Sequence, residues 1–96
     1  MAKGYRIARV DVSDAQAYGR YVEGTADAFA KCGATFLARG GRTAPLEGTA
    51  RSRNVVIEFE SLEQAVACHQ SPEYQRARAH RIGAAEADLY IVEGVA

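Results

Sequence analysis

The same short pattern occurs twice in this chain, and each time it follows a strand-like stretch. Ser13-Asp14-Ala15-Gln16-Ala17 comes after residues 5–12, and Ser61-Leu62-Glu63-Gln64-Ala65 comes after residues 53–60. Ser followed three residues later by Gln is a capping box, in which the Ser hydroxyl accepts a hydrogen bond from a backbone amide and Gln reaches back. The repeat predicts two strand–helix units, each followed by a further strand. This βαβ-βαβ order is the split βαβ or ferredoxin-like pattern, an α+β fold whose antiparallel sheet carries both helical segments on one face.

The other segments fit this order within a single domain of residues 1–96. Four stretches have the apolar patterns of strands, at residues 5–12, 34–39, 53–60 and 89–93, and three have helical spacing, at 13–32, 61–70 and 73–85. The last two helical stretches are separate because Pro72 suits the first turn of a new helix, with Ser71 as its cap. Gly19 and Gly24, inside the first helix, predict that this helix lies close against the sheet.

The pair Gly40-Gly41 decides how the strands are counted. Two glycines favour either a tight hairpin or a bulge within a continuing strand. The split βαβ order needs one antiparallel connection between its halves, and the polar stretch 48–52 already supplies it. We therefore predict a bulge, after which the strand continues from Arg42 to Glu47, beyond the subunit and toward a partner. Pro45 fits this location because it lacks an amide hydrogen and belongs at a sheet edge.

Both faces of the strands carry apolar side chains. Val55, Ile57 and Phe59 share one face of their strand and would meet the helices, which leaves Val56 on the other face. An exposed apolar sheet face is prone to association, and a chain of 96 residues has only a small core of its own. We therefore predict a homodimer with twofold symmetry, packed sheet against sheet.

Charge and targeting signals exclude several partners. Twelve basic and twelve acidic residues leave a net charge of zero, which argues against nucleic acid and against an anionic membrane surface. No stretch has the length of a signal peptide or a membrane span, so we expect a cytoplasmic protein. Cys32 and Cys68 are too few for a disulfide framework and lack metal-type spacing, so we expect them to pack as small apolar groups.

Several stretches taken together resemble the family called domain of unknown function 1330. They are Arg39-Gly40-Gly41, Glu47-Gly48, Val56-Ile57-Glu58-Phe59, Ser71-Pro72-Glu73-Tyr74-Gln75 and Val92-Glu93-Gly94. The resemblance covers essentially the whole chain and implies a ferredoxin-like subunit of a dimeric α/β barrel. It implies no reaction, because the wider superfamily includes cofactor-free monooxygenases, lactone isomerases, haem enzymes and plain ligand binders. The chain departs from the family pattern at Ala67-Cys68-His69, where aromatic residues are common.

Charged residues within the predicted elements are the first candidates for a site. Ten of the twelve basic residues are Arg, whose planar fork binds carboxylates in pairs of hydrogen bonds. Arg39, Arg53 and Arg81 can line a cleft between the first helix and the sheet, where Arg39 or Arg53 would hold a substrate carboxylate. Glu58 could then act as a base. Alternatively, these four residues form ion pairs across the sheet or the dimer interface.

Tyrosines and histidines add weaker candidates. Tyr18, Tyr21 and Tyr74 lie on helix faces that point inward, where each tyrosine either rims a pocket or packs in the core with its hydroxyl bonded. His80 is either a general base or a solvated surface residue. His69, His80 and Cys68 lack the spacing of a metal site. No phosphate-binding loop or dinucleotide motif occurs. We therefore expect neither a metal nor a cofactor.

These observations predict a small homodimer with a pocket between the first helix and the sheet. The pocket would suit a small organic molecule, with an anion as one option. Three functions stay open at this point. The chain could be a cofactor-free isomerase, lyase or monooxygenase, a non-catalytic ligand-binding or stress-related module, or a structural dimer with no pocket. The sequence alone does not decide whether the chain is an enzyme.

Overall fold

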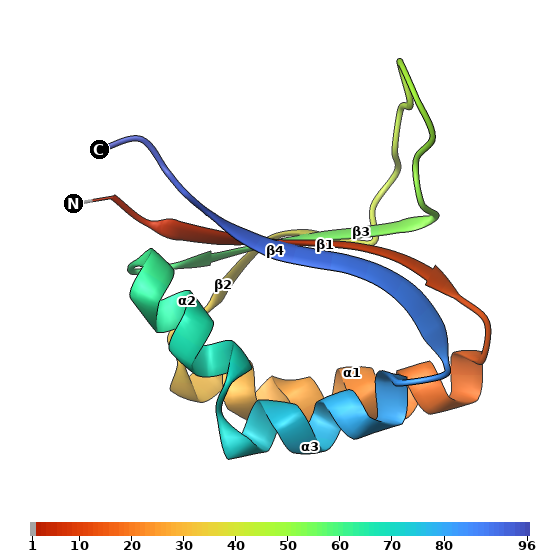
Figure 1. Ribbon diagram of the computed structural model, residues 1–96, viewed down its shortest axis with the longest axis horizontal. Helices are drawn as coiled ribbons and strands as arrows, with labels where there is room; N and C mark the ends of the chain where they lie inside the picture. The colour runs from red at the N-terminus through yellow and green to blue at the C-terminus, as the bar shows by residue number, and fades with distance from the viewer. Residues whose placement is uncertain (1) are drawn as a thin grey trace.

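The strands and helices follow one another in the predicted order (Figure 1). The computed structural model describes residues 2–96. Its elements are β1 (Gly4–Val12), α1 (Ala15–Lys31), β2 (Thr35–Arg39), β3 (Arg53–Phe59), α2 (Leu62–His69), α3 (Pro72–Arg81) and β4 (Ala85–Glu93). The four strands form one antiparallel sheet in the order β2-β3-β1-β4, and all three helices cover the same face. The fold is therefore ferredoxin-like, as predicted.

The helices α2 and α3 begin where the sequence predicts. The Ser61 hydroxyl accepts a hydrogen bond from the Gln64 amide at 3.0 Å, and the Ser71 hydroxyl accepts one from the Tyr74 amide at 3.2 Å. Pro72 occupies the first turn of α3, where its missing amide hydrogen has no consequence. Both helix starts are set by contacts within four residues of sequence.

The start of α1 differs from the prediction. Asp14, not Ser13, caps this helix, and its carboxylate accepts a hydrogen bond from the Ala17 amide at 3.1 Å. The Ser13 hydroxyl instead donates to the carbonyl oxygen of Ala84 at 3.0 Å. The backbone amides of Ser13 and Asp14 donate to the same oxygen. Ser13 is therefore used to join the end of β1 to the start of β4.

Side chains alternate between the two faces of the sheet. On the helix face, Ala8 and Val10 of β1 lie beside Val55, Ile57 and Phe59 of β3, and all five are buried. Arg6 belongs to the same face and is only 2% exposed, which places a cation in the central layer of the core. The opposite face carries Ile7, Val56 and Tyr90 in direct cross-strand register.

The predicted bulge at Gly40-Gly41 is wrong. Gly40 has a φ of +64°, a left-handed conformation that favours glycine, and its amide donates to Asn54 at 2.9 Å to close the β2–β3 ladder. Strand β2 ends at Arg39, and the exposed residues 40–50 form a loop on the side of the sheet opposite the helices (Figure 1). The actual register shift lies between Phe36 and Ala38.

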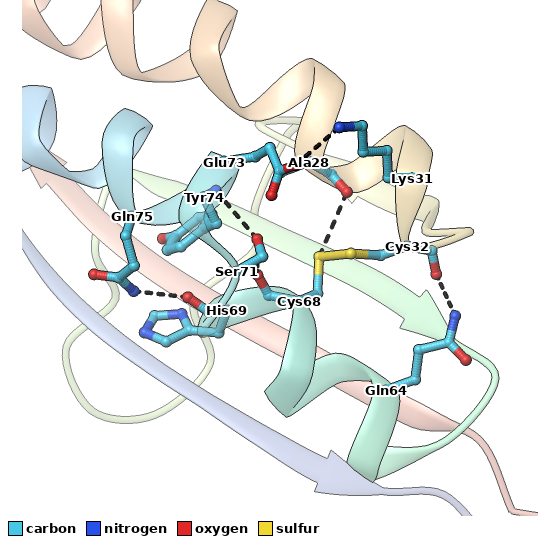
Figure 2. The surroundings of a disulfide bond; sticks show 10 residues. All are labelled: Ala28, Lys31, Cys32, Gln64, Cys68, His69, Ser71, Glu73, Tyr74 and Gln75. Atoms are coloured by element: carbon cyan, nitrogen blue, oxygen red, sulfur yellow. Dashed lines mark hydrogen bonds and ion pairs between the residues drawn. A yellow bond between two sulfur atoms is a disulfide. The ribbon is translucent and has the colours of Figure 1, made fainter.

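Cys32 and Cys68 form a disulfide rather than packing as free thiols (Figure 2). Their Cα atoms are 5.9 Å apart, within the range that a disulfide spans. The sequence prediction failed here because the spacing of 36 residues gives no sign that the end of α1 meets α2. Disulfides are rare in cytosolic proteins, so this bond argues against the expected cytoplasmic location. The location itself stays a prediction.

The backbone of α1 packs closely on that of α3, whereas α1 reaches the sheet through long side chains such as Phe29, which contacts Phe36 and Phe59. A Cβ atom at Gly24 would lie 2.9 Å from the Cβ of Ala77 in α3, whereas one at Gly19 would meet nothing within 4 Å. The prediction that these glycines bring α1 against the sheet is therefore wrong.

Within residues 2–96, no helix is long and apolar enough to span a bilayer.

Candidate functional site

A cavity of about 400 Å³ lies between α1 and the helix face of the sheet. Its floor includes Ala8, Val10, Val55 and Ile57, and α1 supplies the opposite wall. Several of the lining residues are alanines, namely Ala8, Ala26, Ala30 and Ala34. Alanine side chains are too short to fill the space between a helix and a sheet, so this part of the interior stays open where a core would normally be close-packed.

Within residues 2–96, four arginines line the cavity and no carboxylate does. They are Arg6, Arg39, Arg53 and Arg81. Among the ion pairs formed by residues 2–96, the cations are Lys3, Arg9, Lys31 and Arg51. The alternative that Arg39, Arg53 and Arg81 form ion pairs within the subunit therefore finds no support. The chain is neutral as a whole, but this cavity is locally positive.

Arg6 and Arg81, with the hydroxyl of Tyr21, form what we call the inner group. Arg6 donates from Nη2 to the Tyr74 hydroxyl at 2.5 Å, and its guanidinium lies 5.3 Å from the Phe29 ring centroid. Arg81 is 8% exposed and lies 5.2 Å from the Tyr21 ring centroid. The hydroxyls of Tyr21 and Tyr74 are 2.9 Å apart. The inner group is thus held in place by aromatic rings and phenolic hydroxyls.

Arg39 and Arg53 form a second set, which we call the outer group. The guanidinium of Arg39 lies 3.6 Å from the Phe36 ring centroid, and that of Arg53 lies 5.7 Å from the Tyr18 ring centroid. Arg39 is exposed and Arg53 is half-buried, so this set lies where the cavity meets solvent.

Several of these cations have donors without partners. The Nε atoms of Arg6, Arg53 and Arg81 are buried and form no hydrogen bond in the described structure. An uncompensated buried cation costs several kcal/mol, and each unmade hydrogen bond adds to that cost. The neighbouring rings recover part of this cost through cation–π contacts. An anion bound in the cavity would recover more, because it supplies a counter-charge to the buried guanidinium groups.

Burial keeps Tyr21 in its neutral form. It raises the pKa of Tyr21 to about 12, with the nearby Tyr74 hydroxyl contributing in the same direction. The phenol therefore keeps its proton at neutral pH and can donate a hydrogen bond, but it is a poor base. His69 lies with its ring 4.7 Å from that of Tyr74, and burial together with the charge of Arg6 lowers the pKa of His69. His69 is thus neutral at neutral pH and supports Tyr74 by contact.

The cavity brings together most of the residues proposed for ligand binding. Tyr18, Tyr21, Arg39, Arg53 and Arg81 all line it. Tyr74 does not. It is fully buried behind the lining, at 0% exposure, where its hydroxyl bonds Arg6 and Tyr21. Tyr74 therefore positions the inner group and does not contact the open space.

The two residues proposed for catalysis lie elsewhere. Glu58 is on the opposite face of the sheet, where it accepts a hydrogen bond from the Tyr5 hydroxyl at 3.4 Å and lies 3.9 Å from Lys3. His80 lies in a shallow surface hollow beside α1 and α3, with Asp27, Glu73 and Arg76. The described part of the cavity lining therefore holds no carboxylate and no imidazole. Residues 2–96 also contain no cluster of three His, Cys, Asp or Glu side chains placed to bind a metal.

The residue that sequence reasoning missed is Arg6. A signal was available, because Arg6 is two residues before Ala8 and four before Val10, and alternate residues of a strand share a face. The apolar Ala8 and Val10 meet the helices, so Arg6 must do so as well. An arginine at the start of a strand is usually solvated, and the sequence does not show that β4 pairs with β1 beyond Arg6, as far as Gly4.

The sequence profile described as "Domain of unknown function (DUF1330)" matches residues 3–95. The chain belongs to the DUF1330 family. This agrees with the resemblance seen in the sequence. No curated protein sequence matches this DUF1330 chain.

Solved structures with this fold include a protein of unknown function from Rhodopseudomonas palustris. That protein is 19% identical, with a TM-score of 0.78 over 99% of this chain and 84% of its own. A protein from Bacteroides fragilis, described as dimeric and ferredoxin-like and of unknown function, is 14% identical, with a TM-score of 0.64 over 95% of each chain. SnoaB from Streptomyces nogalater, described as a cofactor-independent oxygenase, is 12% identical, with a TM-score of 0.64 over 100% of this chain and 96% of its own. At these identities the likeness establishes the fold alone.

Proposed function

We propose that this DUF1330 protein binds a small organic anion in the cavity between α1 and the sheet. One observation carries the proposal: Arg6 and Arg81 are buried in a cavity whose lining includes no carboxylate. Natural proteins pair a buried guanidinium with an acid or with a ligand, since an unpaired one is strongly unfavourable. A carboxylate in the cavity would supply the counter-charge that these two guanidinium groups lack.

The rest of the lining favours a ligand with an apolar body. Aromatic and aliphatic side chains make up most of the wall, including Tyr18, Phe29, Phe36, Val55 and Leu89. A volume of about 400 Å³ lies within the usual range for small-molecule sites. A simple inorganic anion would leave this apolar surface uncovered. Aromatic and medium-chain aliphatic acids fit both the walls and the charge.

The binding test compares acids with neutral analogues of the same shape. We expect phenylacetate and octanoate to raise the melting temperature, and phenylacetamide and octanamide to leave it unchanged. Arg6→Gln should abolish the effect of the acids. Arg20→Gln is the matched control, because Arg20 is exposed on α1 and does not line the cavity. If acids and amides act alike, or if Arg6→Gln responds as the native chain does, the proposal is refuted.

The proposed assembly is a homodimer that covers the outer face of the sheet. Ile7, Val56 and Tyr90 lie in one cross-strand row there, and Tyr90 and Leu37 are 51% and 54% exposed. Relatives of the same fold are described as dimeric. The loop 40–50 rises on this side and would reach a second copy (Figure 1). Sedimentation of the native chain as a monomer at micromolar concentration would refute the dimer, and Val56→Lys should dissociate it.

Cofactor-free catalysis in the same cavity is the second candidate function. Two observations favour it, the shared fold of a cofactor-independent oxygenase and the buried guanidinium donors, which would stabilise a developing enolate or phenolate. Because neither Glu58 nor His80 reaches the cavity to accept a proton, the substrate would have to arrive ionised or release its proton to solvent. Any acid that binds should be incubated with native and Arg6→Gln protein and followed by NMR. A ligand that stays unchanged for both proteins excludes catalysis of that ligand and leaves binding intact.

A further inference from the structure

We infer that the cavity selects ligands with two acidic groups joined by an apolar spacer, such as aromatic or medium-chain dicarboxylates. This inference rests on the anion-binding function proposed above and adds the class of ligand. Its basis is that the cavity contains two separate sets of arginines, the inner group and the outer group, with an apolar surface between them.

The strand register separates the two groups. Arg6 and Val10 are on the helix face of β1 and are four residues apart, and Arg53 of β3 lies directly opposite Val10. Four residues of strand span about 13 Å. The two guanidinium groups also lie against different neighbours, since that of Arg6 contacts Phe29 and Tyr74 whereas that of Arg53 lies beside Tyr18 and Gly40. Each group is placed to take an anion of its own.

The sheet between the two groups is apolar. Ala8 lies midway along β1, with Val55 of β3 opposite on one side and Leu89 of β4 opposite on the other. All three side chains line the cavity. A ligand bridging the two groups must cross this row, which offers no hydrogen-bonding side chain from the sheet. A methylene chain or an aromatic ring suits that position, and a polar spacer does not.

The outer group is preorganised without a carboxylate. Arg39 is stacked at 3.6 Å on Phe36. Arg53 extends over Gly40, where even one added Cβ atom would lie 2.6 Å from its Nη1 atom. The absence of a side chain at Gly40 thus leaves room for the Arg53 guanidinium, and the same residue allows the left-handed turn. Side chains that are held before binding lose little entropy when a ligand arrives.

The two groups should differ in their sensitivity to salt. The inner group is buried, and screening by ions is weak there, whereas Arg39 is exposed. The additional affinity from a second acid group should therefore shrink as salt is added. The affinity that the first acid group contributes should change much less.

Calorimetric titration of matched acids tests the inference. The pairs are suberate against octanoate and para-carboxyphenylacetate against phenylacetate. We expect the diacid of at least one pair to bind the native chain roughly tenfold more tightly than its monoacid, as one additional charge-assisted hydrogen bond provides. In the double variant Arg39→Gln/Arg53→Gln the preference should disappear while the monoacid binds as before. Arg42→Gln, in the exposed loop, is the control and should keep the preference.

The outcomes separate this inference from the proposed function. Equal binding of monoacids and diacids, or a diacid preference that survives in the double variant, overturns the inference alone. Absence of binding by any acid overturns both proposals. If Arg53→Gln lowers the melting temperature, Arg39→Gln alone serves as the test, because Arg39 is exposed and its loss should not unfold the chain. Arg39→Gln alone should reduce the diacid preference partially and leave monoacid binding unchanged.

Discussion

Reduction of the Cys32–Cys68 disulfide should destabilise the fold and weaken ligand binding together. The bond closes a loop with a sequence separation of 36 residues. In the chain-entropy description, such a loop restricts the unfolded chain by about 4 kcal/mol, and measured effects of single disulfides are commonly 2–4 kcal/mol. For a domain of this size that corresponds to a fall in melting temperature of roughly 10–25 °C. Figure 2 shows that the bond joins the end of α1 to α2.

The contacts beside the disulfide predict the effect on the cavity. The Gln64 side chain donates to the Cys32 carbonyl oxygen, and Lys31 bonds Glu73 at 2.8 Å (Figure 2). These exposed contacts contribute little by themselves. Phe29, three residues before Cys32, packs on Arg6 at the inner group. Loosening this end of α1 should therefore lower the affinity for acids as well as the free energy of unfolding.

The assay is thermal unfolding of the native chain and of Cys32→Ala/Cys68→Ala, each with and without a phosphine reductant. We expect the reductant to lower the melting temperature of the native chain and to leave that of the variant unchanged. The reduced chain should keep its fold, because the Cys68 sulfur lies 3.6 Å from the Ala28 carbonyl oxygen, an acceptor for the free thiol. A native chain that melts at the same temperature with and without reductant would refute the reasoning.

Three further experiments probe the cavity and the packing of α1 above it. Arg6→Met should raise the free energy of unfolding of the unliganded chain by about 1–3 kcal/mol, since it removes a desolvated cation. The same variant should abolish stabilisation by acids. Denaturant titration with and without octanoate measures both effects. Gly24→Val should cost about 1–3 kcal/mol, because its Cβ would lie 2.9 Å from that of Ala77, whereas Gly19→Ala, in open space, should gain up to about 1 kcal/mol. Folding stability should fall by up to about 3 kcal/mol between pH 10 and pH 12, since Tyr21 holds its proton more tightly when folded, and Tyr21→Phe should lack this component.

The predictions that succeeded rest on local chemistry. Ser61 and Ser71-Pro72 start their helices as expected because the bonds involved are between residues three apart. The strand Arg53–Phe59 is correct because side chains of one strand alternate between a buried and an open face. The repeat of strand, cap and helix then leaves few ways to connect the chain, and the ferredoxin-like order follows.

The predictions that failed depend on which segments meet. Asp14 replaces Ser13 as the cap because the distant Ala84 carbonyl oxygen takes the Ser13 hydroxyl. Gly40 ends a strand instead of bulging it, because its left-handed conformation turns the chain away once its amide has bonded the Asn54 carbonyl oxygen. Glu58 does not join the arginines because its strand turns it to the opposite face.

By itself, the sequence determined the fold class, the element order and the surplus of arginine. Periodicity and capping act over a few residues and can be read without a partner segment. Only the tertiary structure decided that α1 stands off the sheet over alanines, that Cys32 meets Cys68, and that Arg6 is buried beside Arg81 with no acid at hand. Each of these depends on the distance between segments far apart in the chain. The amino-acid sequence does not state how close such segments lie. Their packing decides it, as the packing of α1 on α3 shows.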